Sequence, residues 1–436
     1  MTFHHLSTDR LSAIDDPNPL VVDEILAPVM PLIVEEARKM PHDAGTYTLS
    51  FEPFTLNLLV GLICGIKSIG LLVTHIQTSA VASTLGLVQA SKSMYSEAFL
   101  RYNAATYRAI FYALLEKLHF LEISEIRALG RFCCVDGSFF PALLTMTWAL
   151  YQEKKKAIKL HLAFELNRMI PVLFLLTEAN ASERKMLLNM VEVGVTYIAD
   201  RGYVCFDLFH QICTRQAHFV IRATSNLLID VYETLPVEIP VTWSQFFTDV
   251  TDGKIRFTHD PNSHDYRRVS FMAMGEAFSL ITDRFDLQTS DVIMLYAYRW
   301  QVELVFRFLK RTMHSLHLMC HHPSGLEIQF TLYMIAYLLL LHFKQTCAPV
   351  EEEVEIDIDE INQIDMSHDG NPDEVESDSS KPAAQPSMFY VCGLVSLLGN
   401  RVRQYWKMGI HWLTTVRNLL LEPFTPDTKR LIWSKQ

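Results

Sequence analysis

The stretch RFCCVDGSFF, residues 131–140, marks the point where helical patterning gives way to strand-like patterning. Two more strand-like runs follow: AIKLHLAFEL at 157–166 alternates, and MIPVLFLLTE at 169–178 is almost continuously apolar, as buried strands are. The next segments are predicted to be a helix at 181–191 with Ser182 as its N-cap, a strand at 196–200, a helix at 206–216 and a strand at 218–223. This β-β-β-α-β-α-β order predicts an α/β fold with a mixed sheet flanked by helices.

The segments on either side differ in character. Residues 46–125 are typical of helices, and within them Ala82–Gly86 followed by Ala90–Tyr102 is compatible either with a DNA-contacting helix-turn-helix or with an ordinary helical bundle. Residues 225–284 are strand-rich, with turn signals, and we expect them to form a separate insertion. One long helix is predicted from about 290 to 313 and another at 328–343.

These patterns divide the chain into six predicted regions. They are a helical N-terminal region that includes the possible DNA-contacting segment (1–125), the first part of an α/β core (126–224), the β-rich insertion (225–284), the second part of the core with its long helix (285–345), an acidic linker (346–387) and a C-terminal helical region with a basic face (388–436).

The charge of the chain is unevenly distributed. Of its 49 acidic and 38 basic residues, the segment 351–381 holds 13 and one, which leaves 36 acidic against 37 basic elsewhere. The formal net charge of −11 therefore comes from one segment, and any affinity for nucleic acid must arise from local basic patches. The segment itself is interpreted as a disordered linker or as an autoinhibitory mimic of DNA.

Nothing in the pattern predicts export or a membrane span. The N-terminus lacks the basic and apolar regions of a signal peptide, and Lys67 interrupts the apolar stretch 58–73, which suits a buried helix better. The eight cysteines lack secretory spacing and lie among apolar neighbours. We therefore expect a cytoplasmic protein with reduced thiols and no membrane partner.

The predicted long helix carries an unusual set of polar residues on one face. With Tyr296 at 0° on a helical wheel, Arg299, Glu303 and Lys310 all fall within an arc of about 60° next to an apolar face. From geometry alone, a solvated face with an Arg299–Glu303 pair is the better explanation of this pattern.

Two aspartates make a functional site the better interpretation. Asp136 lies inside an apolar strand, where a charge is costly unless it has a partner or a metal, and Gly137 beside it would let a substrate approach the backbone. Asp200 ends a short strand, which is the usual position of site residues in α/β sheets. Carboxylates from three core elements suit two divalent metal ions, with Arg299 and Lys310 binding neighbouring phosphates.

At these residues the sequence resembles the DDE transposases of bacterial insertion sequences, in the branch called the IS-four family. The family signature Y-x2-R-x3-E-x6-K is met at every spacing by Tyr296, Arg299, Glu303 and Lys310. VDGSFF resembles the first aspartate block and ADRGY, at 199–203, the second. The resemblance covers roughly residues 85–345.

The resemblance implies an RNase H-like fold with a β-rich insertion between the second Asp and the Glu. It implies that Asp136, Asp200 and Glu303 bind two Mg²⁺ or Mn²⁺ ions, and that Tyr296, Arg299 and Lys310 contact DNA phosphates. It also implies cleavage at terminal inverted repeats, strand transfer into target DNA, a homodimer on paired ends and association with the nucleoid. Trp300 and Trp243 are candidates for stacking on a flipped base, with an ordinary core position as the alternative.

Other interpretations remain open. A DNA-binding repressor derived from a transposase would usually have lost a triad residue, and an RNase H-like nuclease without strand transfer would not need the exact signature spacing. A zinc site is a further alternative, built from the close cluster His314, His317, Cys320, His321 and His322.

Overall fold

The computed structural model describes residues 19–40, 49–142, 145–152, 155–224, 227–240, 247–258, 260, 264–273, 275–313 and 315–346. The acidic segment 351–381, the C-terminal helices expected at 388–422, Trp243 and His314 lie outside these ranges.

Helices precede the sheet, as the sequence predicts for residues 46–125. They are α1 (Pro19–Leu26), α2 (Met30–Lys39), α3 (Phe51–Ile63), α4 (Ile69–Thr78), α5 (Ala80–Thr84), α6 (Lys92–Arg101), α7 (Ala104–Lys117) and α8 (Ser124–Leu129). Side-chain caps begin several of them: Ser91 accepts the Met94 N–H at the start of α6, and Asn103 accepts the Ala105 N–H at the start of α7. Gly86, at φ +65°, makes the turn between α5 and α6.

A ten-stranded mixed sheet forms the centre of the molecule. Its strands are β1 (Arg131–Ala142), β2 (Leu150–Gln152), β3 (Lys155–Glu165), β4 (Ile170–Glu178), β5 (Val195–Ala199), β6 (His218–Arg222), β7 (Ile229–Thr234), β8 (Thr248–Phe257), β9 (Tyr266–Ala273) and β10 (Glu276–Thr282). The order is β2-β3-β1-β5-β6-β10-β9-β8-β7, with β4 also paired to β3. β1 runs antiparallel to β3 and parallel to β5, and the register places the carboxyl end of β5 beside the middle of β1.

The predicted β-β-β-α-β-α-β order is confirmed by β1, β3, β4, α9 (Glu183–Leu188), β5, α10 (Phe206–Thr214) and β6, with the short β2 added. Ser182 does occupy the N-cap position of α9, but its side chain makes no capping hydrogen bond. The α/β class is therefore correct, and the mixed sheet is the element that positions the site.

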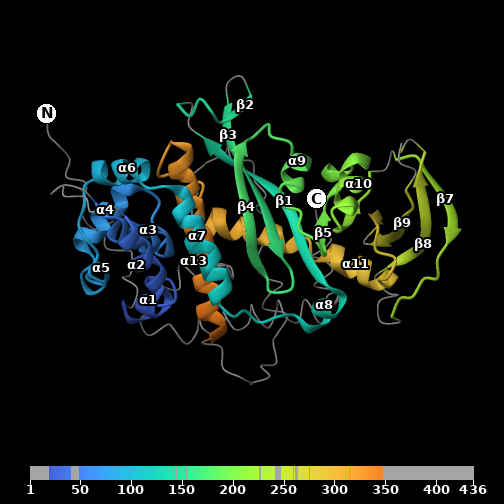
Figure 1. Cartoon of the computed structure of the whole chain (residues 1–436), viewed down its shortest axis with the longest axis horizontal. Helices are drawn as coiled ribbons and strands as arrows, with labels where there is room; N and C mark the ends of the chain where they lie inside the picture. The colour runs from blue at the N-terminus through green and yellow to red at the C-terminus, as the bar shows by residue number, and fades with distance from the viewer. Residues whose placement is uncertain are drawn as a thin grey trace, which may run out of the picture.

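The strand-rich segment 225–284 does not stand apart from this sheet. Strand β10 pairs antiparallel with β6, and β9, β8 and β7 follow it in order. The insertion therefore extends the central sheet, and β7 to β9 form the far end of the molecule in Figure 1.

The predicted long helix at 290–313 is interrupted. It consists of α11 (Thr289–Ala297), α12 (Trp300–Arg307) and a π-helical turn (Phe308–Thr312). At the break, the N–H groups of Arg299, Gln301 and Val302 donate to carbonyls only three residues back. This tighter winding ends one helix and starts the next, so the expectation of a continuous helix is wrong.

Helix α13 (Pro323–Thr346) joins the helical region to the sheet, because it contacts α3, α6 and α7 as well as β4 (Figure 1). Among the described residues it is the one helix long and apolar enough to cross a membrane, but 83% of its apolar window is buried inside the protein. Its apolar character is therefore that of a core helix.

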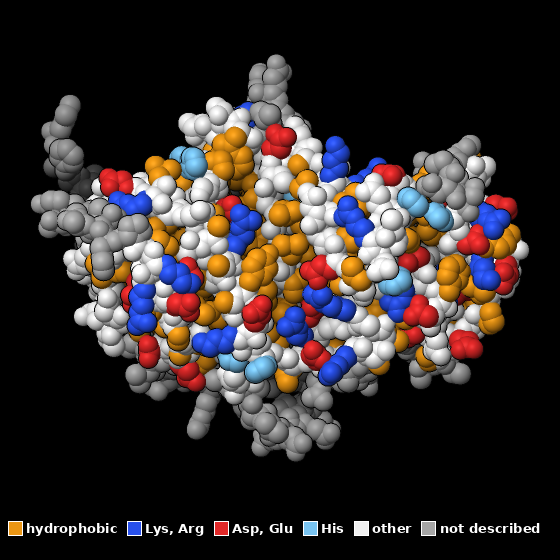
Figure 2. Space-filling model, viewed as in Figure 1, with side chains coloured by type: hydrophobic (Ala, Val, Ile, Leu, Met, Phe, Trp, Pro, Cys, Tyr) orange, Lys and Arg blue, Asp and Glu red, His pale blue; other side chains and the backbone are white. Residues whose placement is uncertain are grey.

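The surface offers no concentrated basic patch on the face drawn in Figure 2. Lysine and arginine side chains are spread over that face and alternate with acidic ones.

Candidate active site

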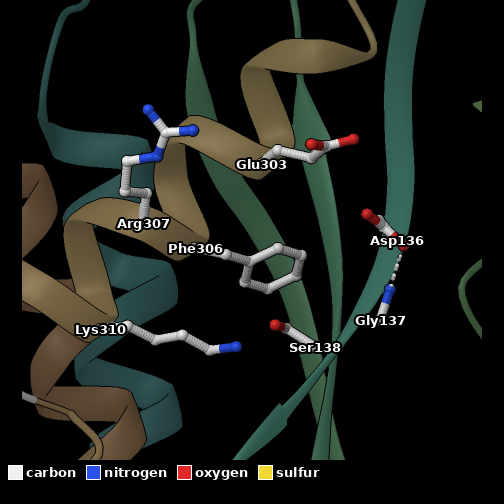
Figure 3. A pocket seen from close by; sticks show the side chains of 7 residues that line it. All are labelled: Asp136, Gly137, Ser138, Glu303, Phe306, Arg307 and Lys310. Carbon is white, nitrogen blue, oxygen red and sulfur yellow. Dashed lines mark hydrogen bonds between the residues drawn. The ribbon is translucent and has the colours of Figure 1, made fainter. Parts of the chain in front are cut away.

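Asp136 lies on β1 at the edge of a cavity of about 290 Å³ (Figure 3). The cavity is lined by Asp136, Gly137, Ser138, Glu303, Phe306, Arg307 and Lys310. Burial raises the pKa of Asp136 to about 6, against the opposing effect of Arg299, and the Gly137 N–H donates to its Oδ1 at 2.7 Å. A carboxylate held here lacks the solvation it has in water and favours a cation beside it.

Glu303 faces Asp136 across this cavity from α12 (Figure 3). Its Oε1 accepts a hydrogen bond from Arg299 Nη2 at 2.9 Å, one helical turn earlier. Phe306 forms the apolar wall between Glu303 and Lys310, and Arg307 points away from Asp136 (Figure 3). Two of the three predicted carboxylates therefore share one cavity.

Arg299 lies between these carboxylates. Its side chain is 5% exposed, and its Nη1 is 3.9 Å from Asp136 Oδ2. Burial opposes its charge, yet the pKa of Arg299 is raised because Tyr296, Asp200, Glu303 and Asp136 all stabilise the guanidinium. The interruption between α11 and α12 places it there, since Arg299 itself occupies the junction.

Lys310 reaches the cavity from the π-helical turn. Its ammonium points into the cavity near Ser138 (Figure 3), 5.0 Å from the ring centre of Phe140. Burial lowers the pKa of Lys310, and Asp136 partly offsets this. The ammonium is therefore a cation directed into the cavity, where it is suited to an anionic ligand.

Asp200 joins the site from one side without lining the cavity. It follows β5 directly and accepts the Arg201 N–H at 2.7 Å, which starts the short 3₁₀ turn Arg201–Tyr203. The Tyr296 hydroxyl donates to Asp200 Oδ1 at 3.3 Å. Burial raises the pKa of Tyr296 to about 12, so this phenol remains a hydrogen-bond donor at neutral pH.

The remaining predicted residues lie differently. Trp300 is partly buried at the start of α12 and is not among the residues lining the cavity. Cys320 contacts the backbone of His322, and within the described part of the chain no three His, Cys, Asp or Glu residues are close enough to hold a metal ion. The zinc interpretation therefore gains no support there.

The three predicted carboxylates, Asp136, Asp200 and Glu303, are also not close enough together in this structure to form such a group. Their oxygen atoms are the hard ligands that Mg²⁺ and Mn²⁺ prefer, so the donor set fits in kind. The guanidinium of Arg299 takes the place of a cation between Asp136 and Glu303. The carboxylates thus already surround a positive charge, and a metal ion would compete with Arg299 for them.

Sequence reasoning overlooked part of the cavity wall. Phe306 and Arg307 are three and four residues after Glu303, so helical spacing was available as a signal for them. Ser138, two residues after Asp136, lies on the same face of β1 and was available by strand alternation.

The part of the chain that contains the candidate site is similar to known proteins. Residues 127–339 match the family described as the transposase DDE domain. A putative transposase of Sinorhizobium fredii is 28% identical over 221 residues, which cover 50% of this chain and 61% of that protein. A probable transposase for an insertion sequence element of Geobacillus stearothermophilus is 23% identical over 196 residues, covering 45% of this chain and 52% of that protein.

The matched region thus spans between about half and three fifths of these relatives' length. Among solved structures, endonuclease V of Bacillus subtilis aligns with 45% of this chain and 82% of that chain at 9% identity, with a TM-score of 0.21. Similarity at that level carries no argument about the fold.

Proposed function

Since this chain belongs to the DDE transposases of insertion sequences, we propose that it cleaves DNA at the terminal inverted repeats of its element and transfers the excised ends into target DNA. The observation that carries the proposal is the cavity in which Asp136 and Glu303 face each other, with Arg299 between them and Lys310 pointing in. An RNase H-like core is part of the proposal, supported by the β-β-β-α-β-α-β order and by β1 pairing parallel with β5.

In this proposal Asp136, Asp200 and Glu303 hold two divalent ions, Mg²⁺ or Mn²⁺. Such ions activate an attacking oxygen and stabilise the leaving one in phosphoryl transfer. Tyr296 holds Asp200 through its hydroxyl. Lys310 binds a phosphate of the DNA as a point charge, and Arg299, once released from Glu303, binds a neighbouring phosphate with two N–H groups.

Three further parts of the proposal concern partners. The protein acts as a homodimer on two paired DNA ends, as the family resemblance implies. Trp300 stacks on a base near the cleavage point, next to Arg299 in sequence. The helices around Ala82–Tyr102 contact the repeat sequence.

The test is cleavage of a labelled DNA carrying the element's own ends, with Mg²⁺ or Mn²⁺, by wild type and by Glu303→Gln. We expect metal-dependent cutting at the repeat boundary, lost in the variant. The matched control is Glu327→Gln, because Glu327 is similarly exposed (28% against 31%) and pairs with Arg108 at 2.8 Å, as Glu303 pairs with Arg299 at 2.9 Å.

Each other outcome favours a different function. Binding of the ends without cutting by any of the proteins would favour the repressor alternative. Cutting without joining to a target DNA would favour a nuclease that lacks strand transfer. Cutting that survives Glu303→Gln would show that the triad is wrong.

A further inference from the structure

Gly137, next to Asp136, is packed against two charged side chains. Because side chains alternate along β1, a side chain at this position would point to the face opposite that of Asp136. A Cβ at this position would lie 2.7 Å from Lys159 Cε and 2.9 Å from Glu183 Oε1. Lys159 Nζ forms an ion pair with Glu183 Oε1. The close approach at Gly137 is therefore made by the protein's own side chains, where the sequence suggested a substrate.

Glu183 also contacts the segment that follows the second aspartate. A Cβ at Gly202 would lie 3.4 Å from Glu183 Oε2, and Arg184 Nε donates to the Gly202 carbonyl at 3.1 Å. One carboxylate at the start of α9 thus lies against both Asp136–Gly137 and Asp200–Gly202.

The pair with Lys159 fixes that carboxylate in place. Lys159 is 8% exposed and lies 4.6 Å from the ring centre of Phe139, so its ammonium has little water around it. Removing such a charge from water is costly, and an ion pair of this kind is weak evidence for stability alone. The charge of Glu183 also contributes to the raised pKa of Asp136, which places it within electrostatic range of the cavity.

We propose that Glu183 is a positioning residue of the active site, a fourth carboxylate that Lys159 holds between the two aspartate-bearing segments and that sets their spacing. The inference rests on the proposed metal-dependent function, because the spacing of Asp136 and Asp200 matters when they share bound ions. Residues behind metal ligands typically change metal affinity 10–100-fold when they are altered.

The test is calorimetric titration of the full chain with Mn²⁺, for wild type, Glu183→Gln and Lys159→Gln, with thermal unfolding measured for each. We expect both variants to bind Mn²⁺ about tenfold more weakly. Positioning predicts the same direction for both, whereas a pure charge effect would make Lys159→Gln bind more tightly. Glu183→Asp retains the negative charge and should recover part of the Mn²⁺ affinity. It provides the test if either of the other variants folds poorly.

The matched control is Glu165→Gln on the same strand as Lys159. Glu165 is likewise ion-paired, with Arg131 and Arg168, although it is less exposed than Glu183 (4% against 27%), and it does not line the cavity. We expect this variant to lose thermal stability with its Mn²⁺ affinity unchanged within twofold.

Two results would overturn the inference and leave the proposed function standing: wild-type affinity in Glu183→Gln, or tighter binding by Lys159→Gln. A wild-type chain that binds no Mn²⁺ would instead overturn both, since both need a metal at the carboxylates. Loss of Mn²⁺ binding in Glu165→Gln equal to that in Glu183→Gln would assign the effect to general destabilisation.

Discussion

Two buried arginines, Arg267 and Arg299, are held in different ways. Arg267 on β9 donates to both carboxylate oxygens of Asp252 and to the carbonyls of Arg284 and Leu287. Thr289, at the start of α11, donates to the same Asp252. Among the described residues, the contacts of Arg299 are with side chains of the candidate site: Glu303 at 2.9 Å, Asp136 at 3.9 Å and the ring of Tyr296 at 5.7 Å.

The difference in partners distinguishes a structural arginine, Arg267, from one whose contacts a ligand can replace, Arg299. The contacts of Arg267 include two backbone carbonyls and connect β8, β9 and the start of α11. A ligand therefore cannot replace these contacts unless this part of the protein unfolds. The Arg299 contacts are to carboxylates that a metal ion would also bind, so they are exchangeable by ligands. Buried charge alone does not identify a functional arginine; the nature of its partners does.

The largest expected effect is on stability at Arg267. Replacing it with Met leaves Asp252 buried without its counter-charge, which costs about 3–5 kcal/mol of unfolding free energy. Urea unfolding of Arg267→Met against wild type measures this. In the double variant Asp252→Leu/Arg267→Met most of the stability should return, and a double variant as unstable as the single one would contradict the account.

Arg299 should show the opposite profile. We expect Arg299→Ala to cleave end DNA about 10²–10³-fold more slowly, because one preorganised positive donor is lost from the site. Its melting temperature should stay close to that of wild type. The control is Arg108→Ala, which removes the partner of Glu327 and should leave the cleavage rate unchanged.

A smaller effect should appear in metal affinity without DNA. Arg299→Ala vacates the space between Asp136 and Glu303, so Mn²⁺ should bind about tenfold more tightly, equivalent to about 1.4 kcal/mol. Calorimetric titration measures it, with Arg307→Gln as a control that removes a cavity charge from elsewhere. Weaker binding by Arg299→Ala would mean that the guanidinium organises the carboxylates and does not compete for them.

The smallest effect concerns the pH dependence of Asp136 in metal-free protein. Because burial raises its folded pKa from 3.8 to about 6, its ionisation opposes folding at neutral pH. Asp136→Asn should therefore be about 1–2 kcal/mol more stable than wild type at pH 7, with the gap closing as the pH falls through 6 towards 4. Denaturant unfolding across that range in the presence of EDTA checks it.

The counterpart at the other arginine is Asp252→Asn. Here the substitution removes the charge that balances buried Arg267, so stability should fall. If both Asn variants moved in the same direction, the contrast between the two arginines would fail.

What the sequence could predict depends on the range of the interactions. Apart from the short β2, the strands from β1 to β6 carry local patterns, and their type and their order along the chain followed from those patterns alone. The pairing of β10 with β6 is long-range, so the extension of the sheet by residues 225–284 had no local signal. The helical wheel correctly grouped Arg299 with Glu303, but it did not predict the break between α11 and α12 at Arg299.

Glu183 shows the limit most clearly. A glutamate in the first turn of a helix is ordinary in sequence, since carboxylates are favoured there. Its place between Gly137 and Gly202 results from the fold, which brings α9 against β1 and the turn after β5. The sequence shows Gly137 and Gly202, but it does not show that the Glu183 side chain packs against them.

The π-helical turn at Phe308–Thr312 has a genetic consequence. The Met313 N–H donates to the Phe308 carbonyl five residues back, so this turn holds one residue more than an α-helical turn. Deleting one codon between Glu303 and Lys310 would let the helix become regular at little cost, but the lysine would then sit about 120° away from the glutamate. We expect such deletion variants to fold but to be inactive in the proposed transposition. Selection for transposition alone would therefore preserve the six residues between Glu303 and Lys310.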